Sequence, residues 1–121
     1  MNSAVAILQN DPARAKYLAS EIGSVADTVF TVGSLPEFQA LVADFPIHVG
    51  VVDLAFVTFE EIVGLRRQLG IEIVGTHHTP DDEVWSSALA AGALDCCFDD
   101  DGPAICRAIL QHWMAANQAA S

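Results

Sequence analysis

Residues 47–53 have the sequence IHVGVVD, an apolar run that ends on an aspartate. A short continuous apolar run of this kind is typical of a strand that is buried on both faces of a parallel sheet. We therefore predict a strand over residues 47–52, with Asp53 directly after it. A lone carboxylate is costly to bury among apolar side chains, so we expect Asp53 at the mouth of a site.

Four further short runs predict strands at residues 3–9, 27–32, 71–75 and 95–98. Each predicted strand is followed by a segment with apolar residues at helical spacing. The helix starts are marked by N-cap residues, capping boxes and first-turn prolines at Asp11-Pro12, Ser34-Leu35-Pro36-Glu37, Thr58-Phe59-Glu60-Glu61, Thr79-Pro80 and Gly102-Pro103. Strands that alternate with helices predict an α/β fold, a doubly wound (βα)5 parallel sheet with helices on both faces, in a three-layer sandwich. We predict a single domain over residues 1–121.

Composition excludes several classes of protein. The chain has 121 residues, is 52% hydrophobic and only 17% charged, which is unlike a disordered acidic tail. Its 16 Asp and Glu against 5 Lys and Arg give a net charge of -11, so we expect no direct contact with nucleic acid. The sequence has no apolar run near the length of a membrane span and no cationic N-terminal region, and we expect a cytoplasmic protein.

The cysteines are odd in number, and Cys96 and Cys97 are adjacent in a predicted strand. Neighbouring residues of a strand point to opposite faces, so a disulfide framework is not expected, and a reducing compartment fits better. We interpret Cys96, Cys97 and Cys106 as small buried apolar side chains.

The carboxyl ends of the strands are where sheets of this kind place their sites. The residues that this rule selects are Gln9, Asn10, Asp11, Asp53, Thr76, His77, His78, Asp99, Asp100 and Asp101. By position alone, Asp53 is either a phosphoryl-accepting nucleophile or metal ligand, or a carboxylate that caps local backbone amides.

Several segments resemble the receiver domain of bacterial two-component response regulators. These segments are ILQNDPARAKYL, HVGVVDLAF, IVGT and ALAAGALDCCFDDDGP, and the resemblance covers about residues 1–115 with one residue inserted between Thr76 and Gly92. It implies the flavodoxin-like strand order 2-1-3-4-5. It also leaves open whether the chain is the N-terminal part of a longer regulator, with an output domain after residue 121.

The resemblance also implies where the functional positions fall. A working receiver holds Mg²⁺ with an acidic pair after the first strand, and here that pair falls on Gln9 and Asn10. The phosphoacceptor falls on Asp53 and the supporting hydroxyl on Thr76. The lysine after the fifth strand is replaced by Asp99.

These departures predict a degenerate receiver, or pseudo-receiver. Phosphoryl transfer to a carboxylate gathers negative charge that a metal and a lysine normally neutralise. Reversing one such charge is worth on the order of 4 kcal/mol at about 4 Å and an effective dielectric constant near 20. We therefore predict a non-enzymatic signalling module that acts through protein contacts and needs no cofactor. The alternative is a phosphorylatable receiver that uses Asp53 in a phosphorelay and requires Mg²⁺.

A more distant alternative is a metal-binding domain at the same edge. Its candidate ligands are Asp11, Asp53, His77, His78 and Asp99, a set that suits Zn²⁺ or Mn²⁺ better than Mg²⁺. We favour the simpler interpretation, in which the histidines are polar loop residues and the aspartates a solvated acidic run.

Partner binding is predicted on the surface that receivers commonly use, formed by the fourth helix, the fifth strand and the fifth helix. Trp85 and Trp113 fall on those two helices, and tryptophan is favoured at interfaces. We expect a protein partner, an output domain or a homodimer at this surface. Core packing is the simpler interpretation of Trp85.

Overall fold

A computed structural model describes residues 3–55 and 57–120, with side chains as far as residue 116. The described strands are Ala4–Leu8 (β1), Thr28–Val32 (β2), Val49–Asp53 (β3), Glu72–His77 (β4) and Asp95–Phe98 (β5). The helices are Pro12–Ile22 (α1), Leu35–Asp44 (α2), Phe59–Leu69 (α3), Asp82–Ala90 (α4) and Gly102–Ala120 (α5). The predicted alternation of strands and helices is therefore confirmed.

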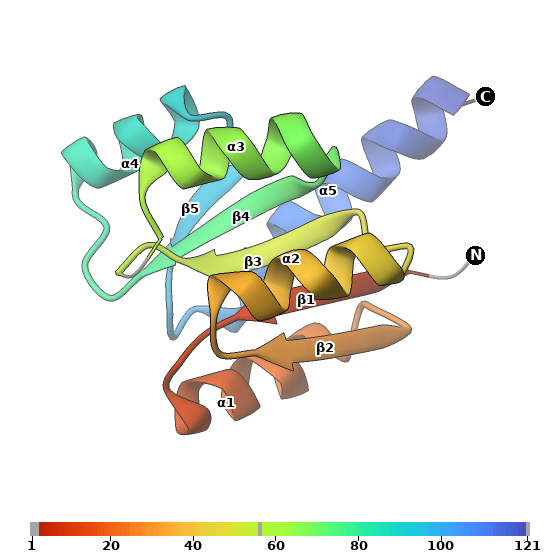
Figure 1. Ribbon diagram of the computed structural model, residues 1–121, viewed down its shortest axis with the longest axis horizontal. Coiled ribbons are helices and arrows are strands. Elements are labelled where there is room, and N and C mark those ends of the chain that lie inside the picture. Colours follow the sequence, from red (N-terminus) through yellow and green to blue (C-terminus); the bar gives the residue numbers. More distant parts are fainter. Residues whose placement is uncertain (1–2, 56, 121) are drawn as a thin grey trace.

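The strands form one parallel sheet in the order β2-β1-β3-β4-β5. Helices α1 and α5 cover one face, and α2, α3 and α4 cover the other (Figure 1). The predicted three-layer architecture and its strand order are thus confirmed. A separate apolar core lies on each side of the sheet, one containing Ile7, Val51 and Ile105 and the other containing Phe38 and Ile73.

The helix starts follow the predicted capping chemistry with one exception. Asp11, Ser34 and Thr58 are the N-caps of α1, α2 and α3, and Thr58 forms a reciprocal capping box with Glu61. The expected start of α4 at Thr79-Pro80 is displaced, because Asp81 is the N-cap and its side chain accepts a hydrogen bond from the Val84 N–H. An aspartate bonded to this backbone N–H caps the helix directly, so the helix begins there.

Two strand boundaries also differ from the prediction. β3 begins at Val49, because the Ile47 N–H donates to the Phe45 carbonyl at 2.8 Å in a turn that follows α2. Asp53 belongs to β3 and does not merely follow it. β4 continues past the predicted end to His77, because Asp53 and Phe98 on the flanking strands still pair with its last two residues.

The orientation of Trp85 corrects its interpretation as a core residue, since 46% of it is exposed. Val84 and Ala88 are the α4 residues that face the small core around Cys96. Trp85 follows Val84 by one residue, which rotates it about 100° around the helix and away from the sheet. Trp113 of α5, in contrast, is half-buried and packs against the core under α1 and α5.

Within the described residues, no helix is long and apolar enough to cross a membrane.

Candidate functional site

The side chain of Asp53 lies at the carboxyl end of the central strand β3, and 8% of the residue is exposed. One carboxylate oxygen, Oδ2, accepts a hydrogen bond from Nε2 of Gln9 at 2.8 Å. The other, Oδ1, accepts from the Ala55 N–H at 2.8 Å. Each oxygen of this nearly buried carboxylate therefore has a hydrogen-bond donor supplied by the chain itself, as burial requires.

Gln9 joins the Asp53 site to the start of α1. It follows β1, only 6% of it is exposed, and its backbone N–H donates to the Val32 carbonyl at 3.1 Å. Its side-chain Oε1 accepts from the Asp11 N–H at 3.0 Å, while its Nε2 faces Asp53. The amide thus uses both its donor and its acceptor side in a geometry that the adjacent backbone holds in place.

Thr76 lies beside Asp53 on the neighbouring strand. The two residues pair across β3 and β4, so their side chains leave the sheet on the same face. Only 1% of Thr76 is exposed, and its hydroxyl donates to the Val52 carbonyl at 3.5 Å. The structure therefore brings together the two residues, Asp53 and Thr76, that the sequence places at the phosphoacceptor and hydroxyl positions.

Asp99 follows β5 at the same edge and faces a cation. Its Oδ1 lies 3.9 Å from a terminal guanidinium nitrogen of Arg14 on α1, with 15% of the Asp99 side chain exposed and 34% of the Arg14 side chain. Such a long, partly exposed pair contributes little stability, of order 0–1 kcal/mol. Sequence reasoning missed it. The sequence offered one signal for this pair. Arg14 lies in the first turn of a predicted helix, at the same edge of the sheet where Asp99 directly follows a predicted strand.

The candidate metal ligands are separated by their local bonds. The Asp11 carboxylate accepts from the N–H groups of Ala13 and Arg14, as the N-cap of α1. The rings of His77 and His78 stack with centroids 4.8 Å apart, and His77 Nδ1 accepts from the Thr79 N–H. Across the part of the chain that the structure describes, no three His, Cys, Asp or Glu side chains form a group able to hold a metal ion.

Comparison with solved structures identifies the fold. The signal receiver domain of a DNA-binding response regulator (merR) from Colwellia psychrerythraea 34H superposes with a TM-score of 0.79 at 16% identity, over 93% of this chain and 99% of that one. The isolated receiver domain of RcsB from Salmonella enterica serovar Typhimurium, with phosphomimetic BeF3-, gives a TM-score of 0.76 at 13% identity, over 92% and 90%.

The chain has the fold of a response-regulator receiver domain. An atypical orphan response regulator, described as having a phosphorylation-independent regulatory mechanism, shares the fold with a TM-score of 0.65 at 13% identity, over 78% of each chain. No family model matches the sequence, and no curated protein matches it.

In this receiver fold a tyrosine fastens α1 to the loop after β5. The Tyr17 hydroxyl donates to the Asp100 carbonyl at 2.7 Å and accepts from the Gly102 N–H at 3.1 Å. Gly102 allows the start of α5 to approach α1 closely, since a Cβ at this residue would lie 2.5 Å from the side chain of Glu21. The acidic loop that begins with Asp99 is therefore held against α1, a contact that has no signal in the sequence pattern.

The cysteines lie as the strand geometry predicts. Cys97 faces the core under α1 and α5, whereas Cys96 faces the core under α4. Burial, with a smaller contribution from Asp95, raises the pKa of Cys96 to about 11 and that of Cys97 to about 12. Burial also raises the pKa of Cys106. All three are free thiols whose protonated form is favoured near neutral pH.

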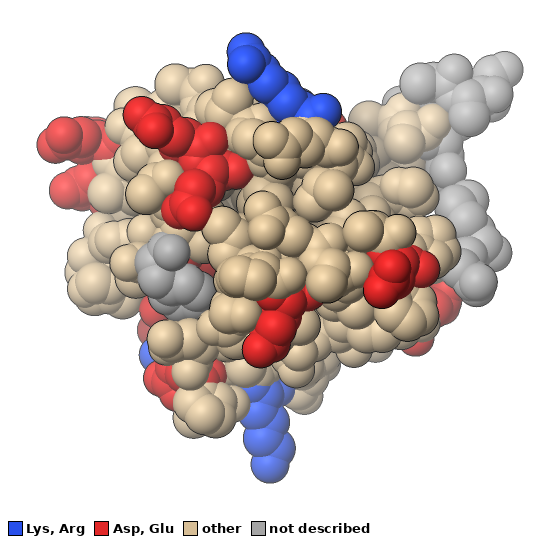
Figure 2. All heavy atoms as spheres, viewed as in Figure 1, with Lys and Arg blue, Asp and Glu red and all other residues tan. Residues whose placement is uncertain are grey.

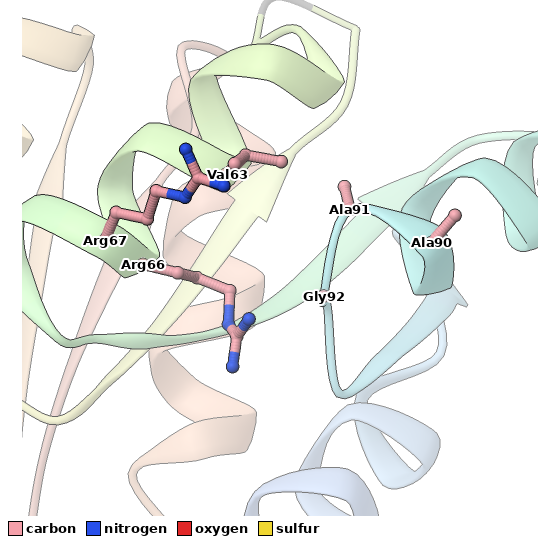
Figure 3. A pocket seen from close by; sticks show the side chains of 6 residues that line it. All are labelled: Val63, Arg66, Arg67, Ala90, Ala91 and Gly92. Carbon is pink, nitrogen blue, oxygen red and sulfur yellow. The ribbon is translucent and has the colours of Figure 1, made fainter.

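A hollow of about 400 Å³ lies between α3 and the end of α4 (Figure 3). Its lining residues are Val63, Arg66, Arg67, Ala90, Ala91 and Gly92. Arg66 extends toward Gly92 and bonds both carboxylate oxygens of Glu72 at 3.4 Å, while Arg67 runs back toward Val63. Gly92 has a φ of 101°, a backbone conformation that favours glycine, and a Cβ there would displace the flexible Arg66 side chain. The arginines diverge, and we interpret them as charges that offset the C-terminal dipole of α3.

Proposed function

We propose that this chain is a non-enzymatic signalling module of the receiver type, which acts through protein contacts without Mg²⁺-dependent phosphorylation of Asp53. The observation that carries the proposal is that both oxygens of the Asp53 carboxylate accept hydrogen bonds from the chain itself. Gln9 Nε2 donates to Oδ2 and the Ala55 N–H donates to Oδ1, each at 2.8 Å. A nucleophilic carboxylate has to present a free oxygen to the phosphorus, and here an internal amide already binds Oδ2.

The donor set beside Asp53 does not suit magnesium. Mg²⁺ prefers oxygen ligands in octahedral array, usually carboxylates and water. Gln9 turns its NH₂ group toward Asp53, and its oxygen is bonded to the Asp11 N–H. The Asp11 carboxylate is directed at the amides of α1. An internal amide therefore stands where the resemblance would place a magnesium ligand.

The charge at Asp99 supports the same conclusion. A phosphoryl group on Asp53 would need a cation at the position that the resemblance assigns to lysine, and Asp99 supplies an anion there. Arg14, 3.9 Å from Asp99, offsets that anion but is bound to it. The atypical orphan regulator shows that a protein of this fold can be described as regulated independently of phosphorylation.

The competing function is a phosphorylatable receiver. The observation in its favour is the pairing of Asp53 with Thr76 on adjacent strands, with both side chains on one face of the sheet. In that case Mg²⁺ would be required, and Gln9 would have to release Asp53 before phosphoryl transfer.

Incubation with acetyl phosphate and Mg²⁺, followed by intact-mass spectrometry, separates the two functions. We expect no phosphoryl adduct on the unaltered chain. We expect the triple variant Gln9→Asp/Asn10→Asp/Asp99→Lys to gain a Mg²⁺-dependent adduct, because it supplies the acidic pair and the cation that the chemistry requires.

The matched control is the same triple variant with Asp53→Ala, which removes the acceptor and should abolish any adduct. A phosphoryl adduct on the unaltered chain that disappears in Asp53→Ala alone would overturn the proposal. Circular dichroism of each variant verifies that the fold is retained.

The partner surface that we propose is formed by α4, β5 and α5. On these elements Trp85 is 46% exposed, Phe98 49% and Met114 60%, and tryptophan is favoured at protein interfaces. Its occupant in the proposed function is a protein partner, an output domain or a second copy of the chain. We place this module in the bacterial cytoplasm.

A further inference from the structure

Strand β2 leaves one side of the sheet open. Among the strands that the structure describes, in the order β2-β1-β3-β4-β5, it pairs only with β1, and its sequence TVFTV contains no charged residue and no proline. The Thr28 N–H donates to the Ser3 carbonyl beside β1, so the N–H and C=O groups of Val29 and Thr31 point the other way, toward the open side. Natural edge strands are usually protected from further pairing by charged residues, prolines or bulges, and β2 contains neither a charged residue nor a proline.

An apolar groove of about 200 Å³ runs beside the first residues of this open strand. Its lining residues are Ala4, Thr28, Phe30, Phe45 and Pro46. The Phe30 and Phe45 rings pack with centroids 5.2 Å apart, yet 49% of Phe45 remains exposed. The groove lies at the amino ends of β1 and β2, at the opposite end of the sheet from Asp53.

The surroundings of the groove are anionic. No Lys or Arg occurs between Lys16 and Arg66, a stretch that includes β2 and α2. The exposed residues Asp27 and Asp44 directly precede the lining residues Thr28 and Phe45. Acidic side chains stand over α2 in the space-filling view, and no basic one does (Figure 2). An occupant of this anionic groove should therefore carry positive charge, and at this place a second copy of the chain, with a net charge of -11, is disfavoured.

We propose that the open edge of β2 and the adjacent groove bind an extended, cationic segment of a partner protein. The segment adds to the sheet as a further strand by bonding the backbone of Val29 and Thr31, and it places one apolar side chain in the groove. Lys or Arg residues that flank that side chain face Asp27 and Asp44. This interaction involves neither Asp53 nor the surface formed by α4, β5 and α5, so it is independent of the function proposed above.

The probe for the test is a fluorescein-labelled peptide with a central Val-Phe-Val flanked on each side by paired lysines, titrated by fluorescence anisotropy. We expect the lysine peptide to bind, its glutamate counterpart not to bind, and added salt to weaken binding. Amide chemical shifts of the ¹⁵N-labelled chain should change at Val29, Thr31 and Phe45. An N-methylated peptide, which cannot donate to the β2 edge, should bind more weakly.

Two variants and two matched controls locate the site. We expect Phe45→Ala to weaken binding roughly tenfold, because it removes the exposed wall of the groove. We expect Asp44→Lys to weaken it by about 2- to 5-fold, the usual value of exposed charge pairs. The controls Phe59→Ala, an exposed phenylalanine on α3, and Asp100→Lys, an exposed acid after β5, should leave the affinity unchanged.

The proposal is overturned by absence of binding, by equal binding of the lysine and glutamate peptides, or by shift changes confined to other elements. Asp44→Lys changes only an exposed charge and should not affect folding. Its loss of affinity therefore still tests the proposal if Phe45→Ala does not fold. Sedimentation that reveals a dimer lost in Phe45→Ala would also overturn the assignment, since the groove would then belong to a second copy.

Discussion

At the scale of single residues, the site is organised around a neutral amide that holds a buried carboxylate. Gln9 and Asp53 are separated by 44 residues in the chain and meet at 2.8 Å. A hydrogen bond to a charged group is stronger than one between neutral groups, and leaving the carboxylate unsatisfied would carry its full desolvation cost. The Gln9 amide is therefore a structural partner of Asp53, and in the function proposed above it also opposes phosphoryl transfer to this carboxylate.

Gln9→Glu should lower the free energy of unfolding by about 1–3 kcal/mol at neutral pH, because it places a second carboxylate against Asp53. The double variant Gln9→Glu/Asp53→Asn exchanges donor and acceptor and should recover most of that loss. Urea unfolding of the single and double variants measures both values. If the double variant is no more stable than the sum of the two single changes predicts, the proposed bond does not contribute.

The two core thiols should make stability depend on pH in the alkaline range. Their pKa values are raised in the folded chain from the ordinary 9.0 to about 11 for Cys96 and about 12 for Cys97, so the unfolded chain loses these protons first. The contribution of the two protonated thiols to the free energy of unfolding is therefore complete below pH 9. It is lost as the pH rises toward 11 and 12, because the unfolded chain is then favoured by releasing these protons. Each thiol can contribute a slope of up to about 1.4 kcal/mol per pH unit.

Urea midpoints measured between pH 8 and pH 11 test this dependence. The variant Cys96→Ala/Cys97→Ala should be less stable at pH 8, where both thiols are protonated, and should have the flatter profile, so that the difference shrinks as the pH rises. All other ionisable groups are the same in both proteins, so the difference between the two profiles reports Cys96 and Cys97 alone. Parallel profiles for the two proteins would contradict the prediction.

At the scale of elements, the packing of α2 against the sheet depends on a glycine of β3, whereas a glycine within α3 has open space beside it. Gly50 of β3 lies under α2, where a Cβ would stand 2.6 Å from Phe38 Cζ and 3.3 Å from Ile71 Cδ1. Gly64 lies inside α3, and a Cβ there would meet nothing within 4 Å. The same substitution should therefore have opposite effects at the two positions.

Gly50→Ala should reduce the free energy of unfolding by about 1–3 kcal/mol, the usual cost of overpacking a core. Gly64→Ala should increase it by about 0.5–1 kcal/mol, because alanine restricts the unfolded chain and favours the helix. Chemical denaturation of both variants against the unaltered chain measures the two changes. Effects of the same sign would show that the α2 contact does not restrict Gly50.

At the scale of the whole molecule, the fold distributes charge and apolar surface unevenly. The side formed by β2 and α2 belongs to a stretch without Lys or Arg, whereas Arg66 and Arg67 lie at the end of α3. Large apolar residues are exposed at Phe45 after α2, at Phe59 on α3 and on the elements α4, β5 and α5. The two partner surfaces proposed above therefore differ in position and composition, as expected for different partners.

The sequence by itself determined the order of elements, the parallel sheet and the placement of Asp53 and Thr76 at one edge. These follow from local periodicity, capping residues and the rule that parallel strands end together, all of which act over short stretches of chain. It also determined that Cys96 and Cys97 occupy opposite faces, because side chains alternate along a strand.

Only the tertiary structure decided which side chains satisfy one another. The bonds from Gln9 to Asp53, from Arg14 to Asp99 and from Tyr17 to the Asp100 loop join segments distant in the chain. It also decided the exposure of Trp85, since Val84 and Ala88 are the α4 residues that face the core and Trp85 is rotated away from them. Hydrogen bonds and packing act over a few ångströms, so partners far apart in sequence become definite only once the chain has folded.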